Sequence, residues 1–134
     1  MGVIYLPLWR IYHFLDEGRS VIHRWLEEEA FTVYQKVLLQ NRIELFGAGG
    51  RDTLPGSIIH VEGDFWAFNV TRKGEIPMNP IFCYGPFHEN EITFLAGAPL
   101  KRGLLKPHHV LPVAQHNLGI LLRDPRRRIR EELT

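Results

Sequence analysis

Basic side chains are concentrated near the C-terminal end of this chain. Residues 1–100 carry 8 Lys and Arg against 12 Asp and Glu, whereas residues 101–134 carry 8 against 3. The second group includes Lys101, Arg102, Lys106 and the run Arg126–Arg130. Ammonium and guanidinium groups bind phosphate through charge-assisted hydrogen bonds. The asymmetry favours a surface for a nucleic acid or an acidic partner, with a solvated end of the chain as the alternative.

Two histidines and one tyrosine are candidates for proton transfer in catalysis. His60 and His88 can titrate near neutral pH, as a general acid or base must. Tyr84 can stack on a base or donate a proton from its phenol. Each residue also has a plain structural interpretation, a surface histidine without a role for the first two and a core aromatic for Tyr84.

Other kinds of site find less support. Three histidines (His108, His109 and His116) are candidate metal ligands, but no carboxylate or cysteine completes a familiar spacing, so we expect no metal and no cofactor. The glycines at 47–50 lack the Gly-Lys-Ser/Thr of a phosphate loop. Cys83, the single cysteine, lies in an apolar run and is expected to be a buried thiol.

Length and composition are those of one globular domain. The chain has 134 residues, of which 45% are hydrophobic and 23% charged. We therefore predict a single domain over residues 1–134, with a basic tail from about residue 123. No apolar run approaches the roughly 20 residues of a membrane helix, and the first residues do not resemble a secretory signal. A lone cysteine suits a reducing compartment, so we expect a cytoplasmic location.

The first half of the chain predicts a strand followed by helix. A strand is expected at about Leu8–Phe14. Ser20 is a suitable N-cap for a helical pattern that runs from Val21 to about Phe46, as one helix or as two with a break near residues 30–32. A short strand is expected over Ser57–Val61.

The second half predicts a sheet and a final helix. Three apolar runs, Phe65–Thr71, Ile81–Phe87 and Glu91–Ala98, are separated by turn residues, which indicates an antiparallel meander. A helix is expected over Val110–Leu122, ended by Asp124-Pro125. The residues beyond it are expected to form a charged tail or one or two further turns of helix. The predicted fold class is α+β, in the order β-α-(α)-β-β-β-α.

Three segments carry a resemblance to a known family. They are Trp9–Tyr12 with Asp16–Leu26, which holds a Gly-Arg-Ser turn; Leu45-Phe46-Gly47; and Glu91–Ala98 with Lys101-Arg102, Pro107 and Ala114. In this order they resemble the opening strand and first helix, the end of the helical pair, and the last strand, basic pair and C-terminal helix of the RelE/HigB superfamily. The resemblance is to the phage-type HigB-like branch of these toxin–antitoxin ribonucleases.

The resemblance implies a RelE-like fold, in which a twisted, mostly antiparallel sheet packs against N-terminal helices. It also implies a toxin that inhibits translation by cleaving messenger RNA, usually on the ribosome, without a metal or other cofactor. The implied partner is a small antitoxin, often a helix-turn-helix protein. Such cleavage by the RNA 2′-OH needs a base, cations at the phosphate and a proton donor for the leaving oxygen.

On this basis we predict two sets of site residues. The predicted catalytic residues are Lys101, Arg102, Tyr84 and His88. The predicted RNA-binding residues are Asn69, Arg72, Lys73, Arg51 and Lys106.

Two positions depart from the family pattern. Asn69 stands where the family usually has a basic residue, and Asn79–Tyr84 lacks the arginine of the usual Tyr-Arg pair. An amide hydrogen-bonds phosphate but brings no charge. The alternative function is therefore a catalytically degenerate RelE-fold protein that binds a protein or RNA, and an unrelated α+β binding module is a third interpretation.

Overall fold

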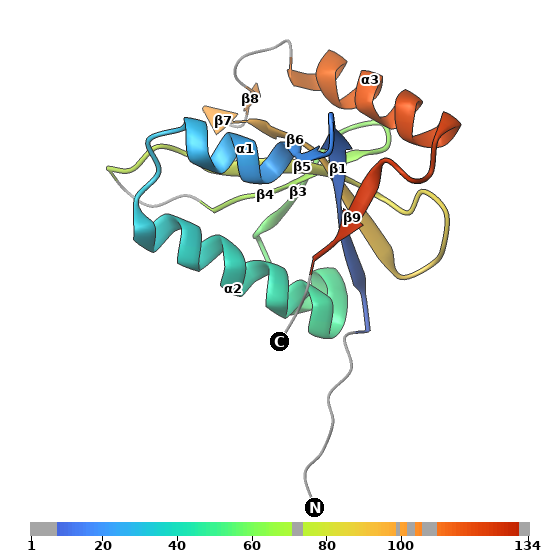
Figure 1. Cartoon of the computed structure of the whole chain (residues 1–134). Coiled ribbons are helices and arrows are strands. Elements are labelled where there is room, and N and C mark those ends of the chain that lie inside the picture. The colour runs from blue at the N-terminus through green and yellow to red at the C-terminus, as the bar shows by residue number, and fades with distance from the viewer. Residues whose placement is uncertain (1–7, 71–73, 99, 102–103, 106–109, 132–134) are drawn as a thin grey trace, which may run out of the picture.

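The computed structural model describes residues 8–70, 74–98, 100–101, 104–105 and 110–131. Within them the chain forms an α+β fold with three α-helices and a mixed seven-stranded sheet (Figure 1). The elements are β1 Arg10–Asp16, β2 Arg19–Ser20, α1 Val21–Glu28, α2 Val33–Gly49, the 3-10 turn η1 Gly50–Thr53, β3 Ile58–Glu62, β4 Phe65–Phe68, β5 Asn79–Tyr84, β6 Glu91–Ala98, β7 Leu100–Lys101, β8 Leu104–Leu105, α3 Val110–Arg123 and β9 Arg128–Arg130.

The sheet has the strand order β2-β1-β6-β5-β4-β3, and β9 pairs with β1. Strands β3 to β6 are antiparallel neighbours in sequence order, which confirms the predicted meander and adds the predicted strand before it. In contrast, β1 runs parallel to β6, with Ile11 opposite Ile92. The first strand therefore joins the far end of the meander and makes the sheet mixed.

Two capping motifs divide the predicted helical stretch into α1 and α2. The Ser20 hydroxyl accepts a hydrogen bond from the His23 N–H at 3.1 Å, which confirms Ser20 as the N-cap of α1. Thr32 and Gln35 form a capping box, in which each side chain accepts from the other residue's N–H. Because Thr32 starts a new helix, the break lies at residues 29–32.

Helix α2 packs on the sheet through Phe46. The Phe46 ring lies 5.6 Å from Phe68 and 5.8 Å from Phe82, so one helix contacts two strands of the meander. Trp25 of α1 lies so close to Gly97 that a Cβ there would collide with the indole. Figure 1 shows α2 and α3 on opposite sides of the molecule. The Asn117 side chain ties α3 to β6 by donating to the Leu95 carbonyl at 2.8 Å.

Several predicted boundaries shift, and several elements were not predicted, namely the two-residue strands β2, β7 and β8, the turn η1 and the strand β9. Strand β1 starts and ends two residues later than predicted, and β4 stops at Phe68. The expectation of further helix after Pro125 was wrong, because Arg128–Arg130 of this charged segment form β9. This strand pairs antiparallel with β1, with Arg130 opposite Tyr12, and its Arg128 side chain forms an ion pair with Glu91 of β6.

Among the described residues, no helix is long and apolar enough to span a lipid bilayer.

Candidate functional site

Three side chains contact Trp66 on the β3–β4–β5 part of the sheet, and a fourth contacts one of them. His60 of β3 lies 4.6 Å from Trp66 between ring centroids, and Tyr84 of β5 lies 5.6 Å from it. The Arg51 guanidinium carbon is 5.2 Å from the Trp66 ring centroid. Trp9 contacts the other side of Tyr84 at 5.7 Å. We call these five residues the Trp66 cluster.

Strand pairing places the rings of the cluster side by side. His60 is directly opposite Trp66, and Trp66 is opposite Phe82. Side chains two residues apart on a strand share a face, so Tyr84 joins Trp66 on that face. Directly opposite residues on paired strands lie within side-chain reach of each other, which explains the ring contacts.

The end of α2 supplies the cationic member of the cluster. Gly50 caps the helix at φ 73°, and a Cβ at this position would collide with the Trp9 indole. Glycine adopts this left-handed backbone without strain, so the chain can turn here and pass close to Trp9. Arg51 follows immediately in η1 and lies over Trp66.

A pocket of about 390 Å³ opens beside the cluster. Its lining is Trp9, Gly49, Gly50, Arg51, Asp52 and Tyr84. Burial raises the pKa of Tyr84, Asp52 adds to this effect, and Arg51 opposes it. The phenol is therefore protonated at neutral pH and is a hydrogen-bond donor.

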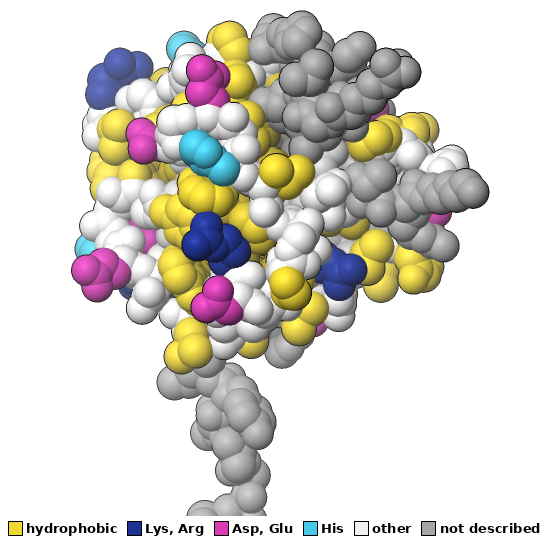
Figure 2. Space-filling model, turned by 180° about the vertical axis from the view of Figure 1, so that it is seen from behind, with side chains coloured by type: hydrophobic (Ala, Val, Ile, Leu, Met, Phe, Trp, Pro, Cys, Tyr) yellow, Lys and Arg dark blue, Asp and Glu magenta, His cyan; other side chains and the backbone are white. Residues whose placement is uncertain are grey.

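Aromatic rings beside cations suit single-stranded nucleic acid. Bases stack on aromatic rings and on guanidinium planes, while cations hold the phosphates. Arg51 and His60 are exposed, and Trp66 is half-buried. Figure 2 shows a face of the molecule on which histidine, basic and acidic side chains lie among hydrophobic ones. Of the predicted site residues, Arg51 and Tyr84 are brought together here.

The other predicted residues are placed as follows. His88 is exposed in the turn between β5 and β6. Asn69 is exposed just beyond β4, where its side-chain oxygen accepts from the Asn79 amide at 3.1 Å. Lys101 belongs to β7, but its side chain lies outside the described part of the structure. Arg72, Lys73, Arg102 and Lys106 also lie outside the described residues.

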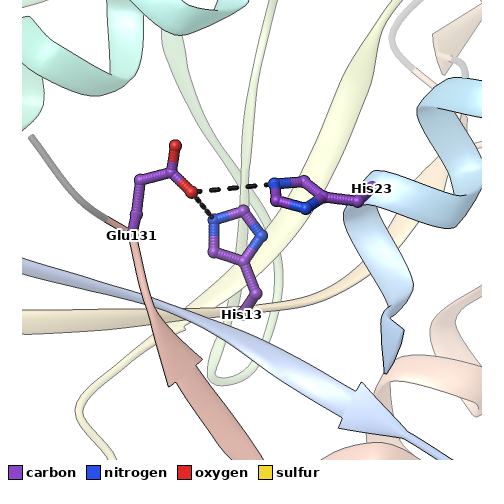
Figure 3. A group of neighbouring side chains, drawn as sticks. All are labelled: His13, His23 and Glu131. Atoms are coloured by element: carbon purple, nitrogen blue, oxygen red, sulfur yellow. Dashed lines mark ion pairs between the residues drawn. The ribbon is translucent and has the colours of Figure 1, made fainter. Parts of the chain in front are cut away.

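A second group of polar side chains lies where β1, α1 and β9 meet (Figure 3). Glu131 Oε2 is 2.7 Å from His13 Nε2 and 3.7 Å from His23 Nε2. The His13 side chain is buried, whereas that of His23 is exposed. Contact with His13 lowers the pKa of Glu131, against the opposing effect of burial.

This second group was not predicted from the sequence. Its histidine spacing matches no familiar ligand pattern, and its carboxylate lies near the far end of the chain. Only the pairing of β9 with β1 brings Glu131 to the histidines, through a hydrogen bond from the Glu131 N–H to the Ile11 carbonyl at 2.7 Å. Of the histidines considered as ligands from sequence, His116 is exposed on α3, and His108 and His109 lie outside the described residues.

A third group is an ion pair with a structural role. Arg128 of β9 contacts Glu91 of β6 at 2.6 Å, and its guanidinium lies over the Tyr12 and Phe87 rings at 3.6 and 4.9 Å. Burial alone would raise the pKa of Glu91, but hydrogen bonds from Arg128 and from backbone N–H groups hold it below its usual range. Cys83 is buried as predicted, and burial raises its pKa to about 12, so this thiol is not a nucleophile.

Comparisons with known proteins give no family for this chain. No protein-family model, no curated protein and no solved structure matches it.

Proposed function

We propose that this protein binds single-stranded RNA at the Trp66 cluster and is a RelE/HigB-like toxin. In this proposal it cleaves messenger RNA without a metal and is neutralised by an antitoxin. The observation that carries the RNA-binding part is Arg51 lying 5.2 Å over the Trp66 ring, with His60 beside it. The cleavage part rests on the resemblance of the ordered segments to the RelE/HigB superfamily.

The proposed roles follow from the chemistry of each side chain. A flipped-out base stacks on Trp66, and Arg51 holds a neighbouring phosphate. Tyr84, with its raised pKa, donates a hydrogen bond from a protonated phenol. Lys101 and Arg102 are the further cations that the transition state needs, by their position in the family pattern.

A non-catalytic RNA-binding protein is the second candidate function. Neither β4 nor β5 contains a lysine or arginine. Asn79 is buried and donates to the Phe68 carbonyl and to Asn69, so the polar side chains at this position hydrogen-bond within the sheet. These observations favour RNA binding without the cations that cleavage requires.

We propose that the partner is a small antitoxin, which binds the outer face of α2. Val33 and Val37 lie one helical turn apart and are 78% and 62% exposed. Exposed aliphatic side chains in one stripe favour contact with another protein. The polar edge of the same helix carries Lys36, which suits an acidic neighbour.

The deciding experiment expresses the chain in a bacterium without any antitoxin. We expect growth arrest and fragmented messenger RNA, with both abolished by the double substitution Lys101→Ala/Arg102→Ala. Normal growth with intact messages at good expression would reject the toxin. In that case, binding of a fluorescent single-stranded RNA by the purified protein still tests the second candidate.

Controls separate RNA contacts from folding. Trp66→Ala and Arg51→Ala change the cluster, whereas Arg19→Ala removes an exposed arginine on β2 that pairs with Glu27. RNA binding that weakens equally in all three variants would be a non-specific effect and would exclude the Trp66 cluster as the site.

A further inference from the structure

Two histidines and a glutamate converge from three separate elements. His13 comes from β1, His23 from α1 and Glu131 from the residue after β9 (Figure 3). One nitrogen from each histidine and one carboxylate oxygen all lie within 4.8 Å of one another. The side chains of His13, Glu131 and His23 are 2%, 15% and 59% exposed, so the group reaches from the core to solvent.

The buried histidine is held in place by a second polar group. His13 Nδ1 lies 3.1 Å from the Ser20 hydroxyl, which itself caps α1. The ring also packs against Phe94 at 5.6 Å and His23 at 4.9 Å. When Nδ1 carries the proton and donates to Ser20, the Nε2 lone pair points toward Glu131. This arrangement, in which the second ring nitrogen is fixed by an outer partner, is the one that metal-binding histidines use.

The remaining nitrogen of His13 is not hydrogen-bonded. Nε2 lies 2.7 Å from Glu131 Oε2, an ion pair when the ring is protonated, but it makes no hydrogen bond of good geometry with any described residue. A buried polar atom without a hydrogen bond is costly and calls for an explanation. An ion between the nitrogen and the carboxylate would satisfy both.

The spacing of the ligand atoms matches a small divalent ion. Zinc binds histidine nitrogen and carboxylate oxygen at about 2.0–2.2 Å, which puts tetrahedral ligand atoms about 3.3 Å apart. The two contacts to Glu131 Oε2, at 2.7 and 3.7 Å, lie on either side of that value. To bind one ion, the three ligand atoms, which now lie within 4.8 Å of one another, would have to move to about this separation.

We propose that His13, His23 and Glu131 form a binding site for a divalent transition-metal ion of the zinc type. Three protein ligands leave the fourth position to water, on the side where His23 reaches solvent. The ion would join β1, α1 and β9, and so would fix the last described strand on the sheet. The site shares no residue with the Trp66 cluster.

Metal binding is tested on the untagged full chain after treatment with a chelator. Isothermal titration with Zn²⁺ alone is expected to show one ion per chain. The same titration with Co²⁺ is expected to give the visible absorption of a four-coordinate site. No saturable uptake of either ion at micromolar concentration would overturn the proposal.

Two variants assign the ligands. His23→Ala changes an exposed side chain and leaves the core intact, and we expect it to weaken Zn²⁺ binding by at least about tenfold. Glu131→Gln is expected to have a similar effect. His116→Ala, an exposed histidine on α3, and the double variant His108→Ala/His109→Ala are the controls and should bind as the parent chain does. Loss of binding in a control with retention in His23→Ala would also overturn the proposal.

Amide hydrogen exchange distinguishes binding at the proposed three-residue site from adventitious binding to surface histidines. Zn²⁺ is expected to slow amide hydrogen exchange in β9 and in the neighbouring part of β1 in the parent chain, and not in His23→Ala. Binding without slower exchange in these strands would mean an ion on surface histidines, against the proposal. RNA binding by the Trp66 cluster is measured separately, so a negative result for the metal site does not affect the RNA-binding proposal, and the reverse also holds.

Discussion

Arg128 and Glu91 form an ion pair across the sheet, with Nη1 and Oε2 2.6 Å apart. Arg128 lies on the last strand and is 10% exposed, and Glu91 starts β6 and is fully buried. Between them in the sheet lies β1, whose Tyr12 ring packs under the guanidinium. The ion pair therefore connects β9 to β6, although the backbones of these two strands are not hydrogen-bonded to each other.

Removal of Arg128 is expected to destabilise the fold strongly. Arg128→Ala removes the closer cation of the buried Glu91 carboxylate and leaves, among the described residues, only Arg10, whose Nη2 is 3.8 Å from Oε1. Breaking a buried ion pair typically costs about 3–5 kcal/mol of unfolding free energy. Urea denaturation followed by circular dichroism measures the loss. Arg126→Ala, at a 90% exposed side chain nearby, is the matched control and should unfold at the same urea concentration as the parent chain. Equal stability of the two variants would contradict a structural role for the pair.

Acid is expected to weaken the fold through Glu91. Its pKa in the folded chain lies below the usual 4.5, so its contribution is complete above that pH. The contribution is lost as pH falls through the lower, folded value, because the folded chain then has to take up a proton that the unfolded chain has already bound. Urea denaturation at a series of pH values between about 6 and 3 measures this loss of unfolding free energy. The decline should be shallower in Glu91→Gln, and an identical decline in that variant would assign the acid sensitivity to other groups.

The first helix is expected to depend on the Ser20 hydroxyl. Ser20→Ala removes the acceptor of the His23 N–H, and the loss of an N-cap costs about 1 kcal/mol. It also removes the partner of His13 Nδ1. Ser20→Thr keeps a hydroxyl at the cap and should recover most of the stability. Thermal denaturation of the three proteins tests the order, and a threonine variant as unstable as alanine would show that packing and not capping is responsible.

RNA binding is expected to depend on the indole of Trp66. Stacking on an aromatic side chain contributes about 1–3 kcal/mol per base, so Trp66→Ala should weaken binding of a short single-stranded RNA by this amount. Trp66→Phe keeps a stacking ring and should retain most of the affinity. Fluorescence anisotropy measures both, with circular dichroism as the check on folding. Unchanged affinity in Trp66→Ala would place the RNA elsewhere.

The salt dependence of RNA binding is expected to report on Arg51. Each phosphate contact to a single strand contributes about 0.7 to the slope of log affinity against log salt. Arg51→Ala should lower the slope by about that amount, whereas Arg19→Ala should leave it unchanged. Equal slopes in Arg51→Ala and the parent chain would mean that this guanidinium stacks on Trp66 without contacting phosphate.

Local signals explain the parts of the fold that could be predicted. Ser20 and the glycines after Phe46 mark helix ends because they act on backbone within a few residues. Turn residues between apolar runs predicted the β4–β5–β6 meander for the same reason. The strand β9 could not be predicted in this way. Its three residues are charged or exposed, and they form a strand because the free edge of β1 offers backbone partners.

The candidate site residues likewise fall into those that local sequence patterns predicted and those that only the tertiary fold brings together. Tyr84 and Arg51 stood out by residue type, and the meander then brought Tyr84 beside Trp66. The contact between Arg51 and Trp66 depends on how α2 ends over the sheet, which no local pattern encodes. The group of His13, His23 and Glu131 was missed entirely, because its third member reaches the others only when β9 pairs with β1.

The place of β9 in the chain has a consequence during protein synthesis. It follows every other described element, so it leaves the ribosome after them. Until then, one edge of β1 has unpaired N–H and C=O groups, and Glu91 is without Arg128. Exposed strand edges invite pairing with other chains. Before β9 pairs with β1, the nascent chain therefore holds an incomplete sheet with an exposed strand edge, and this pairing completes it.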